Sequence, residues 1–452
     1  MKISKLFVVG FLYYLSSLGL CFAQGPKDFI KEDPYRTDGS FYVYDYKTDA
    51  PMTSAPEGYS PFYISHFGRH GARWCTSEYD QLYEWFSKAA AAGVLTESGK
   101  EFFSRYEAYY GKVRNCKGNL SGIGKDQLRT AAGRLYSRFP AVFEGPTHVE
   151  AVSTESARVI MSMWNFLYGL QANDSDIDVN ADASGRYAPW LQPSLSTNPY
   201  LIKGSFLSGK TAEDAYAAYF AQTVPWQEIA GRFFTSADVL GGTLNATPAG
   251  FIETLQSVVV CTRCLEEDRG CFDDVFSPEE MYLVWKAVSA RYFMEMGRFS
   301  ASQARFLDYA AFTLQQIMET ADEDMASGST QLRLRFGHDS GIAPLLILLD
   351  VNGYGRATSS LEESLEIFPS WCLPMGASLQ LVFFRNGAGD ILLKALVNER
   401  EATLPFPAVC GPYYSWNDFK AYYLPAVEDS IRSILSASGN ASTLPASTSV
   451  RH

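Results

Sequence analysis

The most constraining feature of this chain is a histidine that stands among two arginines and two glycines, directly after a strand-like apolar run. The run covers residues 61–67, and the loop that follows begins Gly68-Arg-His-Gly-Ala-Arg73. Glycine lets the backbone turn sharply and approach an anion closely. A neutral imidazole is a good nucleophile near neutral pH, and two planar guanidinium groups can bind the oxygens of a phosphate. The loop therefore predicts a phosphoryl-binding site around His70, with Arg69 and Arg73 as its cations.

A second histidine follows another strand-like segment far along the chain. Residues 331–336 alternate polar and apolar side chains and lead into Gly337-His-Asp-Ser-Gly341. His338 and Asp339 thus stand side by side on a predicted strand-to-helix turn, where the first amides of a helix can also face an anion. Phosphoester cleavage needs a nucleophile, cations and an acid for the departing oxygen. We expect Asp339 to supply that acid.

Strand and helix patterns alternate from about residue 40 to 175 and return after residue 330. This alternation indicates an α/β fold, which we expect to be a three-layer α/β/α core with a mainly parallel sheet. In the expected helix 155–172, Arg158 adds a third cation, and an apolar stripe that includes Met161 and Trp164 is expected to face the core. The expected strands cover 61–67, 148–152, 331–336, 378–385 and 391–397, and the core helices cover 125–139 and 155–172.

The intervening region looks mostly helical, because strand alternation is scarce between residues 175 and 327. We therefore expect a discontinuous α/β core at 24–174 and 328–435, with an α-helical cap inserted at 175–327. Residues 436–452, rich in serine, alanine and threonine, are expected to be a disordered tail. In an open parallel sheet ligands bind at the carboxyl ends of the strands, which is where both histidine loops are expected.

Residues 1–23 have the pattern of a secretory signal. Met1-Lys-Ile-Ser-Lys5 is basic, residues 6–20 are mostly apolar, and Cys21-Phe-Ala23 offers a cleavage site with a small residue. Attachment of a lipid to Cys21 is the competing interpretation. No later segment is apolar over enough residues to cross a bilayer. We expect an exported protein, periplasmic or secreted, without a transmembrane segment.

The composition argues against nucleic acid as a partner. The formal net charge is −12 at pH 7, and binding to a phosphate backbone would need a basic surface. A small phosphate ester remains compatible with this charge, because a few arginines that converge in one cleft reverse the local potential.

Of the eight cysteines, Cys21 lies in the predicted signal, which leaves seven, an odd number. Export favours disulfides among these seven. Their spacing does not decide which of them pair. Cys261, Cys264 and Cys271 could instead form a redox pair or hold zinc, but no histidine lies near them in the sequence. We expect no metal and no cofactor.

Taken together, four segments resemble the histidine phosphatase superfamily, in its acid phosphatase and phytase branch. They occur in the family's order and span nearly the whole chain after the predicted signal. The four segments are Arg69-His70-Gly71-Ala72-Arg73, then Leu120-Ser-Gly-Ile-Gly124 with Gln127, then Ser153-Thr154-x-x-x-Arg158, and His338-Asp339. The resemblance implies an α/β core with an inserted α-helical cap.

The resemblance also implies roles for single residues. It implies a phosphohistidine intermediate on His70, proton donation by Asp339 and no metal, with phosphate held by Arg69, Arg73, Arg158 and His338. Residues 392–400 look like the late strand of multiple inositol polyphosphate phosphatases, whose acid motif is typically His-Ala-Glu rather than His-Asp-Ser. Four lysines are candidates for contacts with outer phosphates: Lys88, Lys100, Lys203 and Lys210.

We therefore expect a phosphomonoester hydrolase whose partners are small phosphate esters, with inositol polyphosphates such as phytate as the leading substrates. Three alternatives stay open. The chain could be a broad-specificity acid phosphatase for sugar or aryl phosphates. It could also be a phosphate-ester binding protein without turnover, or a mutase or transferase that uses the same phosphohistidine.

Overall fold

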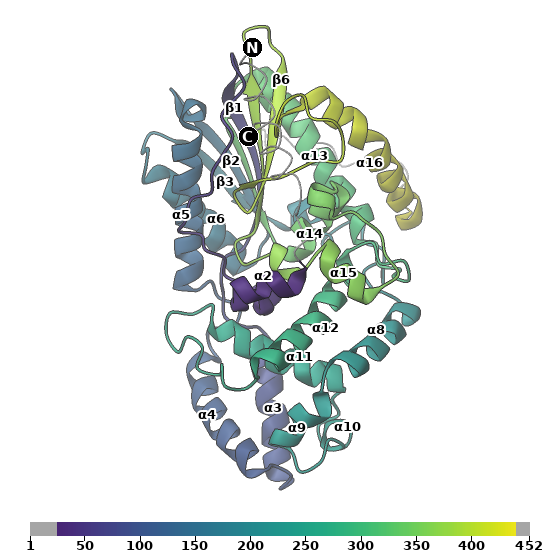
Figure 1. The fold of residues 1–452 in the computed structure, drawn as a ribbon. Coiled ribbons are helices and arrows are strands. Elements are labelled where there is room, and N and C mark those ends of the chain that lie inside the picture. Colours follow the sequence, from purple (N-terminus) through teal and green to yellow (C-terminus); the bar gives the residue numbers. More distant parts are fainter. Residues whose placement is uncertain (1–24, 440–452) are drawn as a thin grey trace, which may run out of the picture.

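The fold is built on one mixed β-sheet, described here from a computed structural model that covers residues 25–439 (Figure 1). The spatial order of the strands is β3-β2-β4-β1-β5-β6-β7, and β8 pairs with β6. Four strands are mutually parallel: β1 (Ser60–Arg69), β2 (His148–Ser153), β3 (Asp178–Ala183) and β4 (Leu332–Gly337). The rest pair antiparallel: β5 (Ser378–Arg385), β6 (Ile391–Val397), β7 (Arg400–Glu401) and β8 (Tyr414–Ser415).

The predicted α/β class is confirmed, but the sheet is parallel only in one half. Strands β5 and β6 are joined by the short turn 386–390, and a connection of that length permits only antiparallel pairing. Strand β5 also runs antiparallel to β1 at the centre of the sheet. The expectation of a mainly parallel sheet was therefore too general.

Helices cover both faces of the sheet and form the outer two layers (Figure 1). One face carries α5 (Gly122–Arg138) and α6 (Ala157–Gln171), which pack on each other and bury apolar side chains with β2, β4 and β5. The opposite face carries α13 (Phe306–Ser327), α14 (Asp339–Leu348) and α16 (Trp416–Ser438). The three-layer arrangement is thus present.

Helix α6 turns a different face to the core from the one predicted. Met161 is 45% exposed and Trp164 is 49% exposed, whereas Val159, Met163 and Phe166 are buried. The prediction failed because apolar residues occupy both faces of this helix, so that periodicity alone does not identify the buried one.

A second group of helices lies beyond one end of the sheet, in the lower half of Figure 1. It includes α3 (Glu78–Ala91) and α4 (Glu97–Val113), which follow β1 in the chain and pack on α9 and α11. From the expected cap range this group contains α8 (Lys210–Thr223), α9 (Trp226–Phe233), α10 (Val239–Gly242), α11 (Pro248–Thr262) and α12 (Pro278–Met296).

The division into core and cap stays a prediction, and three observations bear on it. Strand β3 belongs to the sheet although it lies within the expected cap range 175–327. Helix α13 lies in the same range and packs on α14 and α16. One buried apolar cluster also extends from Phe383 on β5 to Phe251 on α11.

Shorter elements complete the described chain. Helix α2 (Pro26–Glu32) and the 3-10 segment η1 (Pro34–Phe41) precede β1. The remaining short elements are η2 (Pro140–Phe143), η3 (Gly185–Tyr187), α7 (Ala188–Leu191), η4 (Val351–Gly353), α15 (Leu361–Ile367) and η5 (Ser370–Cys372). Among residues 25–439, no helix combines the length and apolar character that crossing a membrane requires. The predicted signal 1–23, including Cys21, lies outside the described residues, as does the expected tail beyond 439; α16 itself reaches Ser438.

The cysteines between residues 25 and 439 are all free, so the expected disulfides are not seen there. Cys261 Sγ donates to the carbonyl of Arg73 at 3.3 Å, and Cys264 Sγ donates to the carbonyl of Phe41 at 3.3 Å. Both thiols are buried. Cys261 thus holds the end of the loop 68–73, called the signature loop below, and Cys264 holds the segment around Phe41.

The signature loop and α5 meet through two glycines. A methyl group on Gly71 would lie 2.6 Å from the Gly124 carbonyl oxygen, and one on Gly124 would lie 2.2 Å from the Ala72 carbonyl oxygen. Ser121, the N-cap of α5, accepts from the Gly124 amide at 3.1 Å and donates to the same Ala72 oxygen at 3.0 Å. The segment 120–124 therefore fixes the loop that carries His70.

Replacing Gly124 by alanine should destabilise the protein, even though alanine favours helices. The added methyl group would overlap the Ala72 carbonyl, so the signature loop or α5 would have to shift. We expect the free energy of unfolding, measured by urea denaturation, to fall by about 1–3 kcal/mol.

The matched control is Gly111→Ala on α4, because nothing lies within 4 Å of a methyl group at that position. Alanine should raise the free energy of unfolding there by about 0.5–1 kcal/mol. Equal effects of the two substitutions would contradict the close contact between α5 and the loop.

Candidate functional site

The six residues predicted for the site lie at the ends of three adjacent parallel strands. Strand β4 lies between β1 and β2, and its register places Gly337 beside Arg69 and Phe336 beside Ser153. The segments that leave these three strands therefore begin at the same edge of the sheet. This edge brings together Arg69 and His70 after β1, Arg158 after β2, and His338 and Asp339 after β4, with Arg73 further along the first loop.

Hydrogen bonds from two helices, α6 and α5, hold the signature loop. The Gly71 amide donates to Ser162 Oγ on α6 at 3.1 Å, and the Ala72 amide donates to Gln127 Oε1 on α5 at 2.9 Å. Gln127 in turn donates to the Met375 carbonyl at 3.1 Å. Gln127 is thus a support for the loop, which explains its place in the sequence motif.

His70 is buried and its ring orientation is fixed. Its Nδ1 lies 3.0 Å from the Gly71 carbonyl oxygen, which can only accept, so Nδ1 carries the proton and Nε2 has a free lone pair. Burial, followed by the charges of Arg69, Arg73 and Arg158, lowers the pKa of His70 well below 6.5. The imidazole is therefore neutral and nucleophilic even in mildly acidic solution.

His338 faces His70, with 5.7 Å between the ring centroids. Arg158 Nη2 donates to His338 Nδ1 at 3.3 Å, which leaves the ring proton on Nε2, 3.2 Å from Thr154 Oγ1. Burial and then Arg158 lower the pKa of His338 to about 4, so this ring is neutral as well.

The three arginines bring positive charge with few neutralising groups. Their Nε atoms are buried and have no hydrogen-bond partner within the described chain. Burial, followed by the charge of Arg73, lowers the pKa of Arg158 to about 10, so the cations disfavour one another. Arg69 is the most firmly held, because its Nη1 donates to the carbonyls of Ser40 at 2.6 Å and Leu373 at 2.8 Å.

Asp339 is the carboxylate of this group. Its Oδ2 accepts from Arg69 Nη2 at 2.8 Å, and its side chain is 29% exposed. Burial raises the pKa of the Asp339 carboxyl, but Arg69, His338 and Arg73 outweigh burial and hold the pKa below its usual range. Without a ligand this residue is therefore ionised.

This arrangement fits a tetrahedral anion. Three guanidinium groups with unused donors surround a neutral imidazole whose lone pair is available, and α14 begins at Asp339 with its first amides at the same place. Keeping three buried cations close together with unpaired Nε donors is costly, and an anion that fills the space between them would offset that cost.

Three groups near the site were not predicted as site residues, although Thr154 belongs to the motif Ser153-Thr154-x-x-x-Arg158. Thr154 contacts His338, and Ser162 links Arg158 to the signature loop by donating to the Arg158 carbonyl at 2.8 Å. Tyr292, on α12, places a buried hydroxyl near Asp339. Ser162 follows Arg158 by one helical turn, which is a signal that the sequence contains; Tyr292 has no comparable signal.

Other candidates lie elsewhere. His66 is buried on β1 between the rings of Phe166 and Phe336, with centroids 4.9 and 5.3 Å away, and burial lowers its pKa to about 3. Its surroundings are those of a structural residue. Three of the candidate lysines pair with acids on their own helices, as Lys88–Glu84, Lys100–Glu97 and Lys210–Asp214.

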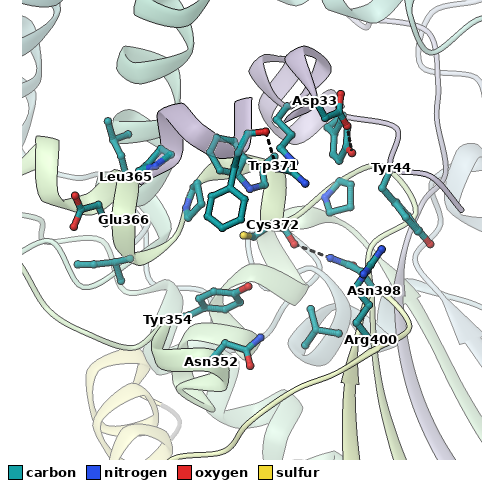
Figure 2. Close-up of a pocket in the computed structure, with 18 of the residues that line it drawn as sticks. Asp33, Tyr44, Asn352, Tyr354, Leu365, Glu366, Trp371, Cys372, Asn398 and Arg400 are labelled. Carbon is teal, nitrogen blue, oxygen red and sulfur yellow. Dashed lines mark hydrogen bonds between the residues drawn. The ribbon is translucent and has the colours of Figure 1, made fainter. Parts of the chain in front are cut away.

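Two cavities adjoin the cluster. One, of about 380 Å³, opens beside Arg158 and is lined by Ser77, Asp80, Lys117 and their neighbours. The other, of about 980 Å³, contains none of the six predicted residues (Figure 2). It is lined by aromatic and polar side chains, among them Tyr354, Trp371 and Arg400.

The second cavity shares a wall with the site. Figure 2 shows Asn398 donating to the Cys372 carbonyl, at 2.9 Å. The next two residues, Leu373 and Pro374, offer their carbonyls to Arg69 from the same segment. Arg69 is therefore held by the chain that separates the two spaces.

No group of three or more histidine, cysteine, aspartate or glutamate side chains arranged to hold a metal ion occurs between residues 25 and 439. The cations around His70 are the three arginines, whose positive charge favours an anion.

Comparison with known proteins agrees with the resemblance inferred from the sequence. Residues 68–223 match the model of a family described as the histidine phosphatase superfamily, branch 2. The superfamily resemblance is thereby confirmed. Curated proteins gave no match to this chain.

Solved structures share the fold at low sequence identity. The multiple inositol polyphosphate phosphatase of Bifidobacterium longum, in complex with inositol hexasulfate, superposes with a TM-score of 0.71 at 18% identity, covering 85% of this chain and 97% of its own. The phytase of D. castellii gives a TM-score of 0.66 at 14% identity, covering 90% and 87%. The Hafnia alvei phytase with tartrate gives 0.51 at 13% identity, covering 83% and 99%.

Because few negative groups lie near the arginines, replacing Arg158 should affect the stability of the protein in opposite ways with and without bound phosphate. Arg158→Met keeps the apolar stem and removes one of three mutually repelling cations, so the ligand-free protein should gain about 0.5–2 kcal/mol in the free energy of unfolding. In inorganic phosphate, the wild type should be stabilised and the variant much less so. Thermal unfolding across a phosphate titration measures both effects.

Arg114→Met is the control, because Arg114 is an exposed residue at the C-cap of α4. It should leave the response to phosphate unchanged. An Arg158→Met protein that is stabilised by phosphate as strongly as the wild type would contradict the assignment of Arg158 to an anion site.

Proposed function

We propose that this chain, which carries the signature segment of the histidine phosphatase superfamily, is a phosphoric monoester hydrolase that works through a phosphohistidine on His70. One observation carries the proposal: three buried guanidinium groups with unused donors surround a neutral imidazole, and a carboxylate lies at the edge of the group. The arginines hold the phosphate oxygens, and Asp339 stands where a leaving oxygen needs a proton.

In the first step, His70 Nε2 forms a bond to phosphorus as the bond from phosphorus to the ester oxygen breaks. The proton of Asp339 passes to that oxygen, so the alcohol leaves neutral. In the second step, a water oxygen bonds to phosphorus as the phosphorus–nitrogen bond breaks. Asp339 accepts the proton of the water, and inorganic phosphate leaves.

Asp339 must gain its proton before the first step. The pKa of this carboxyl is low because Arg69, His338 and Arg73 attract its negative charge, against the effect of burial. A phosphate dianion among the same cations opposes that attraction and raises the pKa of Asp339 in the complex. A proton is therefore taken up with the substrate, and His70, whose pKa is well below 6.5, stays neutral at the acidic pH where this uptake is easiest.

Inositol polyphosphates such as phytate are the proposed substrates. The fold is shared with a multiple inositol polyphosphate phosphatase and with two phytases. The alternative is a broad acid phosphatase for sugar or aryl phosphates. The charges outside the arginine cluster support this alternative. Lys117, in the smaller cavity, is paired with Asp80, so that fewer cations face the outer phosphates of a substrate.

A substrate panel separates these functions. Inorganic phosphate released from phytate, a sugar phosphate and p-nitrophenyl phosphate should be measured in the presence of a chelator. Preference for phytate supports the first candidate, and similar rates on all three support the broad phosphatase. Release from none indicates a binding protein, and release only with an added alcohol acceptor indicates a transferase.

We also propose that the protein is exported, on the basis of the predicted signal in residues 1–23. Cell fractionation and mass determination of the mature N-terminus test this proposal. A mature chain that begins at Gln24 supports cleavage by signal peptidase, and a lipid on Cys21 supports anchoring.

His70→Ala should lower turnover by at least about a thousandfold, because no other group supplies the nucleophile. Phosphate should still bind, since the arginines remain. The wild type, quenched during turnover, should carry an alkali-stable and acid-labile phosphoryl group that the variant lacks.

His148→Ala serves as the control for this experiment. His148 begins β2, at the end of the strand opposite to the site, and bonds to Asp178 and Glu150. The variant should keep full activity. Comparable losses in both variants would show that the assay reports stability rather than chemistry.

Asp339→Asn should affect substrates according to their leaving groups. Alkyl phosphates, whose alkoxide must be protonated, should lose about a hundredfold or more in kcat, and p-nitrophenyl phosphate should lose about tenfold or less. Steady-state kinetics on the two substrates measures the difference. Equal losses would contradict proton donation by Asp339.

A further inference from the structure

The helical end of the molecule contributes one polar group to the neighbourhood of Asp339. Tyr292 is on α12, a helix that packs on α14, and Asp339 is the first residue of α14. The hydroxyl of Tyr292 is buried and has no hydrogen bond of normal geometry within residues 25–439. A buried hydroxyl without a partner is unusual and costly, so its position calls for an explanation.

Most of the charged groups that act on this hydroxyl belong to the candidate site. Burial, and then the Asp339 carboxylate, raises the pKa of Tyr292 well above 10, while Arg69 acts in the opposite sense. Tyr292 therefore keeps its proton and can only be a neutral donor or acceptor. Glu295, the other acid that acts on it, is occupied by Arg291 at 3.0 Å.

We propose that Tyr292 is a positioning residue for Asp339: its hydroxyl, from the helical end of the molecule, donates to the Asp339 carboxylate whenever that carboxylate forms during the reaction. This inference rests on the proposed phosphatase function and adds a residue to it.

The charges around Asp339 explain when this hydrogen bond is needed. In the free protein the carboxylate is bound by Arg69, with Arg73, Arg158 and His338 also nearby. A bound phosphate draws these cations to itself. When Asp339 then gives its proton to the leaving oxygen, the new carboxylate has lost part of its stabilisation, and the Tyr292 hydroxyl replaces it. The contact is stronger with the charged carboxylate than with the acid, so it lowers the barrier to proton transfer.

Tyr292→Phe tests the proposal, because it keeps the ring and removes only the hydroxyl. Loss of a donor to the carboxylate raises the pKa of Asp339, so the alkaline limb of the kcat profile for an alkyl phosphate should move up by about 0.5–1 pH unit. At the plateau, kcat for the alkyl phosphate should fall about three- to tenfold, and kcat for p-nitrophenyl phosphate should change less than about twofold.

Tyr282→Phe is the matched control on the same helix. The Tyr282 ring stacks on Trp285 at 5.8 Å and lies near Lys27, away from Asp339. Removing the Tyr282 hydroxyl should leave both the pH profile and the leaving-group dependence of kcat unchanged. Thermal unfolding of both variants separates a loss of folded protein from a change in chemistry.

A binding measurement makes the test independent of turnover. Sulfate keeps its charge across the working pH range, so proton uptake on its binding, measured by calorimetry in two buffers of different ionisation enthalpy, reports the groups of the protein. The pH range of this uptake should move upward in Tyr292→Phe and stay in place in Tyr282→Phe.

The outcomes distinguish the two proposals. Absence of phosphate release by the wild type from every substrate would overturn the proposed function, whatever Tyr292 does. With an active wild type, an unchanged pH profile and unchanged proton uptake in Tyr292→Phe would overturn the positioning role. So would an equal loss on alkyl and aryl substrates without any shift in the pH profile.

Discussion

A shortage of negative charge around His70 is the constraint on which the site depends. Three arginines converge from two strand ends, and Asp339 is the carboxylate that bonds directly to one of them. Burial together with this imbalance keeps both histidines neutral, and the imbalance holds Asp339 ionised without a ligand and leaves donors free for an anion. The proposed nucleophile, anion site and acid all follow from one electrostatic arrangement, and extensive packing elsewhere in the fold offsets its cost in stability.

Much of this arrangement can be predicted from the sequence. The His70 and His338 loops each follow an apolar strand, and parallel strands that end at the same edge bring their loops together. Strands β5 and β6 begin and end at the predicted residues. Gln127 was part of a recognised motif, although its bonds to the loop and to Met375 became clear only in three dimensions.

Other features depend on contacts that a linear pattern does not contain. Strand β5 could have paired with any neighbour, and its antiparallel place beside β1 is decided by the whole sheet. Helix α6 has apolar residues all round, so Met161 and Trp164 could not be told from the buried face. Tyr292 comes from α12, whose sequence contains no motif that marks this residue, and the packing of α12 on α14 places it near Asp339.

The place of β4 in the sheet has a consequence for how activity is acquired. This strand lies between β1 and β2, yet the ribosome makes it only after the helices α8 to α13. Until it arrives, β1 and β2 have no common neighbour, and the slot between them must be filled from a great distance along the polypeptide. The site is therefore completed late in the folding of a newly made molecule. Any measured turnover comes only from molecules in which β4 has inserted between β1 and β2.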